Sequence, residues 1–184
     1  MLELEFTFLL KAFPPTFLEE IKSEHYQNIK AKKEMIDCYF PPEITHPKIR
    51  LRQNGKKFEL TKKEPLSAED ASIQQEQTIS LTESEFTFFS QLKGKKVHKT
   101  RYLYEYTPGE VAEIDIFQGE LLGLVVVDFE FSNINKKAHF EKPEWCGADI
   151  TQDDFIAGGM IAGKKYEDIQ SSLSKYNYEP LFLK

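Results

Sequence analysis

Residues 110–132 read EVAEIDIFQGELLGLVVVDFEFS, and this stretch indicates the fold most directly. It holds two alternating segments, residues 110–117 and 122–132, in which acidic side chains are separated by Ile, Val or Phe. Successive side chains of a β-strand point to opposite faces, so each segment would carry its acids on one face and its hydrophobic residues on the other. We therefore expect two strands, each with a charged face and a hydrophobic face.

The same alternation predicts six more strands along the chain. They cover residues 2–10, 34–40, 48–53, 56–63, 78–82 and 97–106. Asn54-Gly55 is a strong two-residue hairpin signal, and Pro108-Gly109 supplies a turn before residue 110. The polar stretch 64–77 is predicted to be a long loop or a short helix.

Helical patterns are fewer and shorter. They cover residues 15–32, 84–92 and 165–176, and Thr151 is expected to N-cap a further helix that runs to Ala157. Many antiparallel strands with a few small helices are typical of the α+β class. We predict an eight-stranded antiparallel β-barrel with flanking α-helices.

The bulk properties limit the kind of protein. The chain has 184 residues, which suits one domain, and its net charge of -6 argues against a general nucleic-acid binder. No apolar run approaches the roughly 18 residues needed to span a bilayer, and the N-terminus lacks the basic region of a signal peptide. Cys38 and Cys146 have no metal-like spacing and are expected to be reduced thiols. We expect a soluble cytoplasmic protein that binds neither nucleic acid nor membrane.

Paired polar residues, two apart on one strand face, are the most informative feature. The pairs are Glu3 and Glu5, Arg50 and Arg52, Thr61 and Lys63, Lys99 and Arg101, Glu113 and Asp115, and Asp128 and Glu130. A sheet with one solvated face would also alternate. Here, however, acids and bases are separated by strand, and neighbouring strands of acids repel each other unless a cation lies between them.

This separation indicates the chemistry of a ligand. Mg²⁺ prefers oxygen ligands and usually shares its coordination with substrate phosphates. Arg makes bidentate contacts with phosphate oxygens, whereas Lys acts as a compact point charge. Acids and bases that face one lumen would therefore bind a metal-chelated phosphate chain and polarise it for displacement.

Seven short motifs occur in an order that resembles one protein family. They are ELE, IRLR, LTKK, KTRY, EIDIF, GLVVVDFEF and PEWCGADIT, and together they extend over about residues 2 to 165. In this order they resemble the CYTH family, the triphosphate tunnel metalloenzymes, which includes class IV adenylate cyclases and thiamine triphosphatases. The resemblance implies a single CYTH-like domain over residues 1–184. It also implies an eight-stranded tunnel that holds Mg²⁺ or Mn²⁺ on one side and a triphosphate on the other.

The resemblance also assigns roles to individual residues. It implies metal ligands at Glu3, Glu5, Asp115, Asp128 and Glu130, of which all but Asp115 would also be catalytic. It implies substrate contacts at Arg50, Arg52, Lys63, Lys99, Arg101, Lys164 and Lys165.

Two positions depart from the family pattern. Thr7 stands where the ExExK signature has Lys, and a hydroxyl cannot supply that positive charge. Lys11 has the same strand parity as Thr7 and would replace it in part. The strand around Thr78, where the family has an Arg and two Glu, is largely without its acids.

Three functional hypotheses follow. The first is a metal-dependent hydrolase of inorganic tripolyphosphate or of a nucleoside or thiamine triphosphate. The alternatives are a class IV-like adenylate cyclase, which makes cyclic AMP from ATP, and a catalytically weak polyphosphate- or nucleotide-binding protein, because Thr7 replaces the signature lysine. The sequence is compatible with a monomer or a homodimer.

Overall fold

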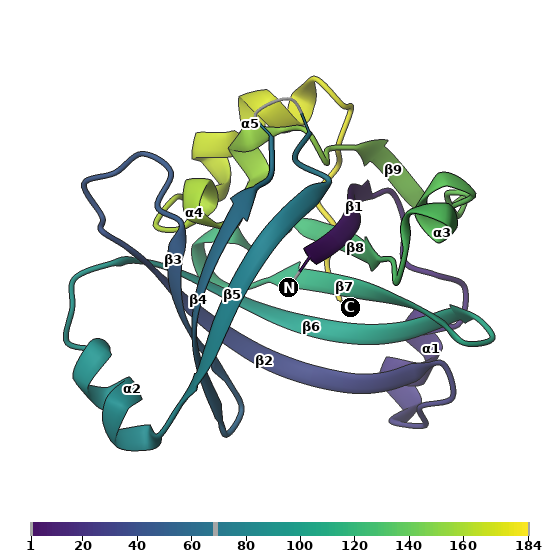
Figure 1. Cartoon of the computed structure of the whole chain (residues 1–184). Helices are drawn as coiled ribbons and strands as arrows, with labels where there is room; N and C mark the ends of the chain where they lie inside the picture. Colours follow the sequence, from purple (N-terminus) through teal and green to yellow (C-terminus); the bar gives the residue numbers. More distant parts are fainter. Residues whose placement is uncertain (1, 68–69, 184) are drawn as a thin grey trace.

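The computed structural model describes residues 2–67 and 70–183 (Figure 1). Its strands are β1 (Leu2–Leu10), β2 (Ile29–Phe40), β3 (Ile49–Asn54), β4 (Lys57–Pro65), β5 (Ile73–Leu81), β6 (Lys95–Thr107), β7 (Glu110–Phe117), β8 (Val125–Glu130) and β9 (Cys146–Asp149). Its helices are α1 (Phe17–Ser23), α2 (Glu83–Phe89), α3 (Ile134–Ala138), α4 (Gly158–Ile161) and α5 (Tyr166–Ser174), with 3₁₀ turns η1 (Gly119–Leu121) and η2 (Asp154–Ile156).

The sheet closes at β1. The strand order is β5-β4-β3-β2-β6-β7-β8-β1-β9, and an additional pairing joins β5 to β1. One edge of β1 pairs with β8, with Glu5 opposite Glu130. The other edge pairs with β5 over residues 2–4 and with β9 from Phe8 onward. Strands β1 to β8 therefore form a closed antiparallel barrel, which confirms the predicted fold.

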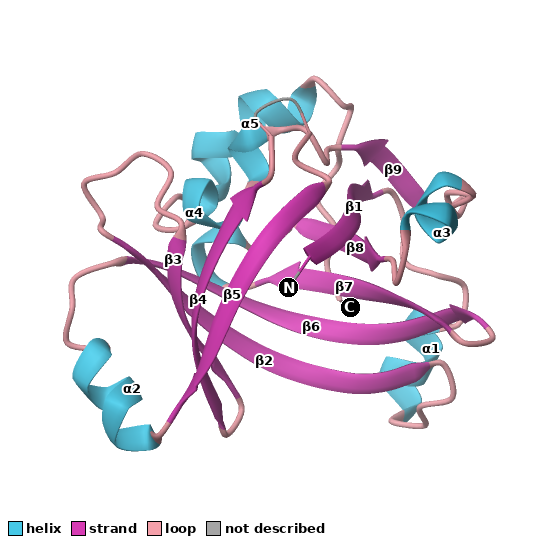
Figure 2. Ribbon diagram, in the orientation of Figure 1, coloured by secondary structure: helices cyan, strands magenta, loops and turns pink. Residues whose placement is uncertain are grey.

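The hydrophobic core of this barrel lies largely outside it. Phe8, Tyr102, Ile114 and Phe129 project from the outer faces of β1, β6, β7 and β8 and are buried. Phe17 of α1 packs into the same cluster, and α2 covers the outer face of β2 to β4 through a smaller one. Figure 2 shows the helices around the barrel, with α4 and α5 together near one end. This arrangement leaves the inner face to polar side chains.

At one end of the lumen, the inward-facing side chains are apolar instead of polar and form a layer. Leu9, Val97, Phe117 and Val126 lie there, in one cluster with Ile161 of α4 and with residues of α5. Each of these strand residues comes two positions from an inward polar residue, so they share its face. The layer lies where the lumen meets α4 and α5.

The predicted helix over residues 15–32 is wrong in its second half. The helix is confined to Phe17–Ser23, and β2 already begins at Ile29. Glu24 has a φ of 53°, which ends the helix. The carboxylate of Glu20 then accepts three backbone hydrogen bonds of 2.9 Å from the residues that lead into β2. Pairing of β2 with β6 along its length outweighs the helical spacing.

The predicted loop over residues 64–77 is wrong at both of its ends. β4 extends to Pro65 and β5 begins at Ile73, because their pairing continues as far as Pro65 and Gln74. A polar segment can form a strand when its partner supplies the hydrogen bonds, and apolar alternation does not reveal this. Of the residues left in the connection, 68 and 69 lie outside the described part of the chain.

Thr151 does not cap a helix. Its hydroxyl oxygen accepts a hydrogen bond from the backbone N–H of Thr7 at 3.0 Å, and the hydroxyl donates to Asp149 at 2.6 Å. Between Thr151 and Ala157, where the helix was predicted, the chain forms the short turn η2. Elsewhere the sequence predictions agree more closely with the structure: β1 has the predicted bounds, and α5 lies within the predicted range 165–176.

The two cysteines and the length of the helices were also subjects of the sequence predictions. Cys38 and Cys146 are free thiols, as predicted, and both are buried. In the described part of the chain, helices are all too short or too polar to cross a membrane.

The outer core should dominate stability. Phe129 is 1% exposed, and its ring contacts those of Phe8, Tyr106, Phe140 and Trp145. We expect Phe129→Ala to lower the free energy of unfolding by about 3–5 kcal/mol, measured by urea denaturation. The matched control is Phe88→Ala on α2, where the side chain is 67% exposed, and its effect should stay within about 0.5 kcal/mol. Equal losses in the two variants would contradict this placement of the core.

Candidate active site in the lumen of the barrel

The lumen holds a cavity of about 370 Å³ whose wall carries both signs of charge. Its acidic side chains are Glu3, Glu5, Asp37, Glu59, Glu76, Asp115, Asp128 and Glu130 on the strands, with Asp153 and Asp154 at one mouth. Its basic side chains are Lys48, Arg50, Arg52, Lys63, Lys99 and Arg101. The strand alternation therefore brings the members of the predicted pairs together in one enclosed space, except Glu113, which does not line the cavity.

One part of the wall gathers acids from β1 and β8. Glu3 and Glu5 project inward from β1, and Asp128 and Glu130 from β8. Burial raises the pKa of Glu5 to about 7, and the charges of Asp128 and Glu3 add to this effect against the opposing charge of Lys63. Burial and Glu3 likewise raise the pKa of Glu130. These carboxylates are closer together than their charges favour.

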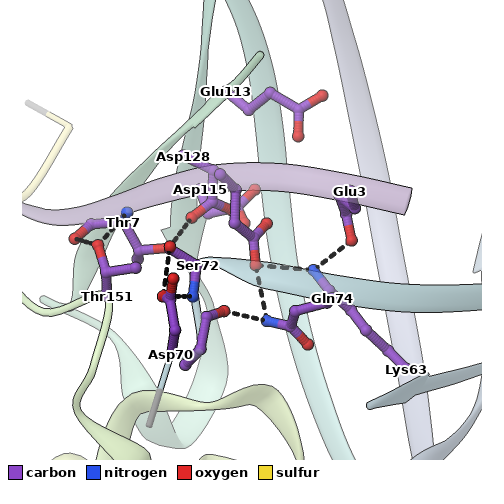
Figure 3. A network of polar contacts seen from close by, with 12 residues as sticks. Glu3, Thr7, Lys63, Asp70, Ser72, Gln74, Glu113, Asp115, Asp128 and Thr151 are labelled. Atoms are coloured by element: carbon purple, nitrogen blue, oxygen red, sulfur yellow. Dashed lines mark hydrogen bonds and ion pairs between the residues drawn. The ribbon is translucent and has the colours of Figure 1, made fainter. Parts of the chain in front are cut away.

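Lys63 lies between two of these acids. Its Nζ is 2.7 Å from Glu3 Oε2 and 2.8 Å from Glu5 Oε1, as Figure 3 shows for Glu3. The amide of Gln74 donates a further hydrogen bond of 3.0 Å to Glu5 Oε1. Although burial alone would lower the pKa of Lys63, Glu5 and Glu3 raise it above its ordinary value, so the ammonium stays charged.

Thr7 has a defined role in place of the signature lysine. Its hydroxyl donates a 2.8 Å hydrogen bond to Asp128 Oδ1 (Figure 3). Thr7 thus orients one of the acids without adding a charge. Lys11 does not replace it: Leu9 already lies in the apolar layer, and Lys11 is exposed beyond the end of β1, outside the cavity lining.

Two of the bases are held by buried carboxylates. Arg52 makes a bidentate pair with Asp37, at 2.7 Å for both contacts, and both side chains are buried. Arg101 makes a bidentate pair with Asp115 at 2.6 Å and also contacts Glu113 and, at 3.0 Å, Asp128. These pairs fix the guanidinium planes before any ligand arrives.

Asp115 orients bases. Its Oδ2 accepts from Lys99 as well as Arg101, and its Oδ1 accepts from Arg101. Burial would raise the pKa of Asp115, but Arg101 and Lys99 outweigh burial and lower it. With both oxygens engaged by bases, these contacts favour an orienting role over the metal ligation that the resemblance implied.

Arg50 differs from the other arginines of the lumen. It forms no ion pair with a carboxylate of the described residues, and its buried Nε has no hydrogen-bond partner there. A buried, unsatisfied donor of a charged group is costly unless a ligand accepts from it. Arg50 can therefore bind an anion without first breaking an ion pair with a carboxylate.

Lys164 and Lys165 do not join this site. Neither lines the cavity, and Lys165 precedes α5 with its Nζ 3.6 Å from Glu120 on the exposed surface. Gly163, with a φ of 76°, turns the chain just before them. The family resemblance implied substrate contacts at both lysines, and their place outside the cavity lining does not support those contacts.

Sequence reasoning missed several charged wall residues, among them Lys48, Glu59 and Asp37. Lys48 and Glu59 lie two positions before Arg50 and Thr61, so strand parity could have found them. Asp37 has no charged residue two positions away in its predicted strand, so strand parity did not single it out. The pairing of β2 with β3 places it opposite Arg52 and shows that it binds that guanidinium.

The chain is similar to known proteins both in sequence and in structure. No family model matches the sequence. An inorganic triphosphatase from Nitrosomonas europaea is 28% identical over 154 residues, 83% of this chain and 91% of that protein. Another from Acetivibrio thermocellus is 31% identical over 74 residues, 40% of this chain and 46% of that protein.

Solved structures show a similarity to the same kind of protein. A crystal structure of an inorganic triphosphatase has a TM-score of 0.59 and 26% identity, with 88% of this chain and 95% of that chain covered. The resemblance to the triphosphate tunnel family is confirmed. A candidate adenylate cyclase from Bacillus halodurans, 16% identical with a TM-score of 0.54 over 98% of this chain and 92% of that chain, shares the fold.

The carboxylates fit a divalent metal ion chemically. In residues 2–67 and 70–183, no three His, Cys, Asp or Glu side chains are arranged to hold a metal ion. However, Glu3, Glu5, Asp128 and Glu130 supply the oxygen ligands that hard cations prefer, and an ammonium already stands between two of them. The cluster therefore has the ligand chemistry that a hard cation needs, with the Lys63 ammonium against two of its carboxylates.

The two arginines of β3 should differ in their effect on stability. Arg52→Met leaves the buried Asp37 without its partner, and we expect a loss of about 3–5 kcal/mol in the free energy of unfolding. Arg50→Met breaks no ion pair and should cost less than about 1 kcal/mol. Chemical denaturation of the two variants measures this difference, and each serves as the control for the other. A larger loss for Arg50→Met would refute the pairing.

Proposed function

We propose that this chain is a metal-dependent triphosphatase that hydrolyses a triphosphate, with inorganic tripolyphosphate as its best substrate and Mg²⁺ or Mn²⁺ as its metal. The observation that carries the proposal is the closed lumen in which oriented Arg and Lys side chains face a cluster of carboxylates. The similarity of the chain to inorganic triphosphatases supports the choice of reaction and substrate.

The basic side chains would bind the phosphates. Arg50 has a free donor, and Arg52 and Arg101 are held by Asp37 and Asp115 with donors still available. Lys99 adds a buried ammonium beside Arg101. Because these groups are positioned before the substrate arrives, they lose little side-chain freedom on binding.

The metal would be held by Glu3, Glu5, Asp128 and Glu130. A bound divalent cation supplies neutralisation of the charge on the phosphate oxygens and orients the attacking water. Thr7 and Arg101 hold Asp128 in place from two sides, at 2.8 and 3.0 Å. Thr7 therefore helps to position Asp128, although it cannot supply the charge of the signature lysine.

Hydrolysis would proceed by in-line attack of water on the terminal phosphorus. The P–O bond to the bridging oxygen breaks, and orthophosphate and pyrophosphate leave. The guanidinium groups of Arg50, Arg52 and Arg101 would stabilise the charge that develops on the phosphate oxygens. The carboxylates that line the cavity outnumber its bases, so a free polyphosphate anion would be repelled.

The decisive test is product analysis. Purified protein is incubated with tripolyphosphate or ATP, each with Mg²⁺, Mn²⁺ or EDTA, and released phosphate and cyclic AMP are measured. We expect metal-dependent phosphate release from tripolyphosphate. Glu130→Gln should lower kcat by about 100-fold, whereas Glu167→Gln on the exposed face of α5 should leave it unchanged. Cyclic AMP as the main product would assign the chain to the cyclases, and binding without turnover would make it a receptor.

Lys99 should give the affinity for phosphate a pH dependence. Burial lowers the pKa of Lys99 to about 8, against the opposing charge of Asp115. The ammonium form, which binds phosphate oxygens, predominates below that pH and is lost above it. We therefore expect the Kd of the metal–tripolyphosphate complex to rise between pH 7 and pH 9, measured by calorimetry.

The control for this pH dependence is Lys99→Met. The variant should bind more weakly at pH 7 and should lack the additional rise, while any change due to ionisation of the ligand persists. An identical pH profile in both proteins would exclude Lys99 as the titrating group.

A further inference from the structure

Lys63 is the basic residue whose contacts differ most from its expected role. The resemblance implied that it binds phosphate, yet in this structure its ammonium contacts the carboxylates of Glu3 and Glu5, at 2.7 and 2.8 Å. Lys63 is on β4, and β5 separates that strand from β1. Its side chain therefore reaches past a neighbouring strand to place a charge among the acids (Figure 3).

These contacts place Lys63 in competition with a metal ion. Glu3 Oε2 and Glu5 Oε1 are oxygens that a divalent cation would use. Glu5 Oε1 accepts a hydrogen bond from Lys63, and Glu3 Oε2 forms an ion pair with it. The three side chains are between 12% and 25% exposed, so solvent screens their charges only partly. An ammonium and a divalent cation at the same oxygens would repel each other strongly.

We propose that Lys63 is an internal counter-ion. Its ammonium occupies the metal site in the absence of substrate and moves to the phosphate chain when substrate binds. The proposal rests on the metal ligands of the proposed function. Its consequence is an order of events: the metal binds weakly alone and tightly together with phosphate. By linkage, Lys63 would couple the two affinities in both directions.

The other bases are less suited to this exchange. Arg101 also reaches Asp128, but Asp115 and Glu113 hold its guanidinium in place. Arg52 is held by Asp37, and Arg50 has no carboxylate to release. Lys63 has a flexible stem, and the two carboxylates with which it forms ion pairs, Glu3 and Glu5, are both proposed metal ligands. It can therefore exchange one anion for another without breaking a buried bidentate pair.

The test measures metal binding in the absence of turnover. Mn²⁺ is titrated by calorimetry into the wild-type protein, Lys63→Met and Lys62→Met, without phosphate. We expect Lys63→Met to bind Mn²⁺ roughly tenfold more tightly than the wild type. Lys62→Met is the matched control, because it removes the same charge one residue away. The side chain of Lys62 is exposed and pairs with Glu64. Its variant should bind Mn²⁺ like the wild type.

A second titration tests the coupling itself. Orthophosphate, a product that chelates metal weakly, should tighten Mn²⁺ binding to the wild type and should have much less effect on Lys63→Met. Lys63→Arg keeps the charge and should bind Mn²⁺ as weakly as the wild type. If Lys63→Met loses cooperative unfolding, Lys63→Gln provides a second neutral side chain for the same comparison.

The outcomes separate this proposal from the proposed function. Mn²⁺ affinity that is unchanged or weaker in both neutral variants overturns the counter-ion role, even if the wild type hydrolyses tripolyphosphate. Tighter Mn²⁺ binding in those variants supports the role, even if the wild type hydrolyses none and the proposed function fails.

Discussion

Burial of ionised groups inside a closed sheet is the constraint on which the structure depends. The desolvation of isolated charges in such a lumen would cost more free energy than the net stability of a small protein. Each charge therefore needs an opposite charge and hydrogen bonds. The Asp37–Arg52 and Asp115–Arg101 pairs meet this need in the wall of the barrel. Hydrophobic burial then has to come from the outer face, where Phe129 and Phe17 pack beneath short helices and loops.

The same constraint prepares the lumen for a ligand. Pairing the bases with fixed carboxylates keeps them extended and oriented, because a side chain held at two donors has few other conformations. The acids of β1 and β8 are balanced less completely: burial, with the charges of Asp128 and Glu3, raises the pKa of Glu5 despite the ammonium of Lys63. Arg50, conversely, has a donor to spare. The unbalanced groups of both signs are the ones best able to accept a metal-chelated phosphate chain.

The sequence predicted the wall better than the contacts within it. Strand parity is a local property, so it identified Glu5, Arg52 and Asp128 as neighbours across one lumen. Pairing between strands is not local, and it decided what parity could not: that Asp37 faces Arg52, and that residues 73–77 belong to β5. The sequence also could not show that Lys63 would lie against acids, since this depends on how far a side chain reaches past β5.

The position of β1 at the seam has an evolutionary consequence. This strand is hydrogen-bonded along both edges, to β8 on one side and to β5 and β9 on the other. Insertion or deletion of a single residue within it would turn Glu3 and Glu5 outward and Leu4 and Phe6 inward, and neither edge could slide to compensate. The N-terminal strand can therefore diverge by substitution, as at Thr7, but its length is held by the partners on both sides.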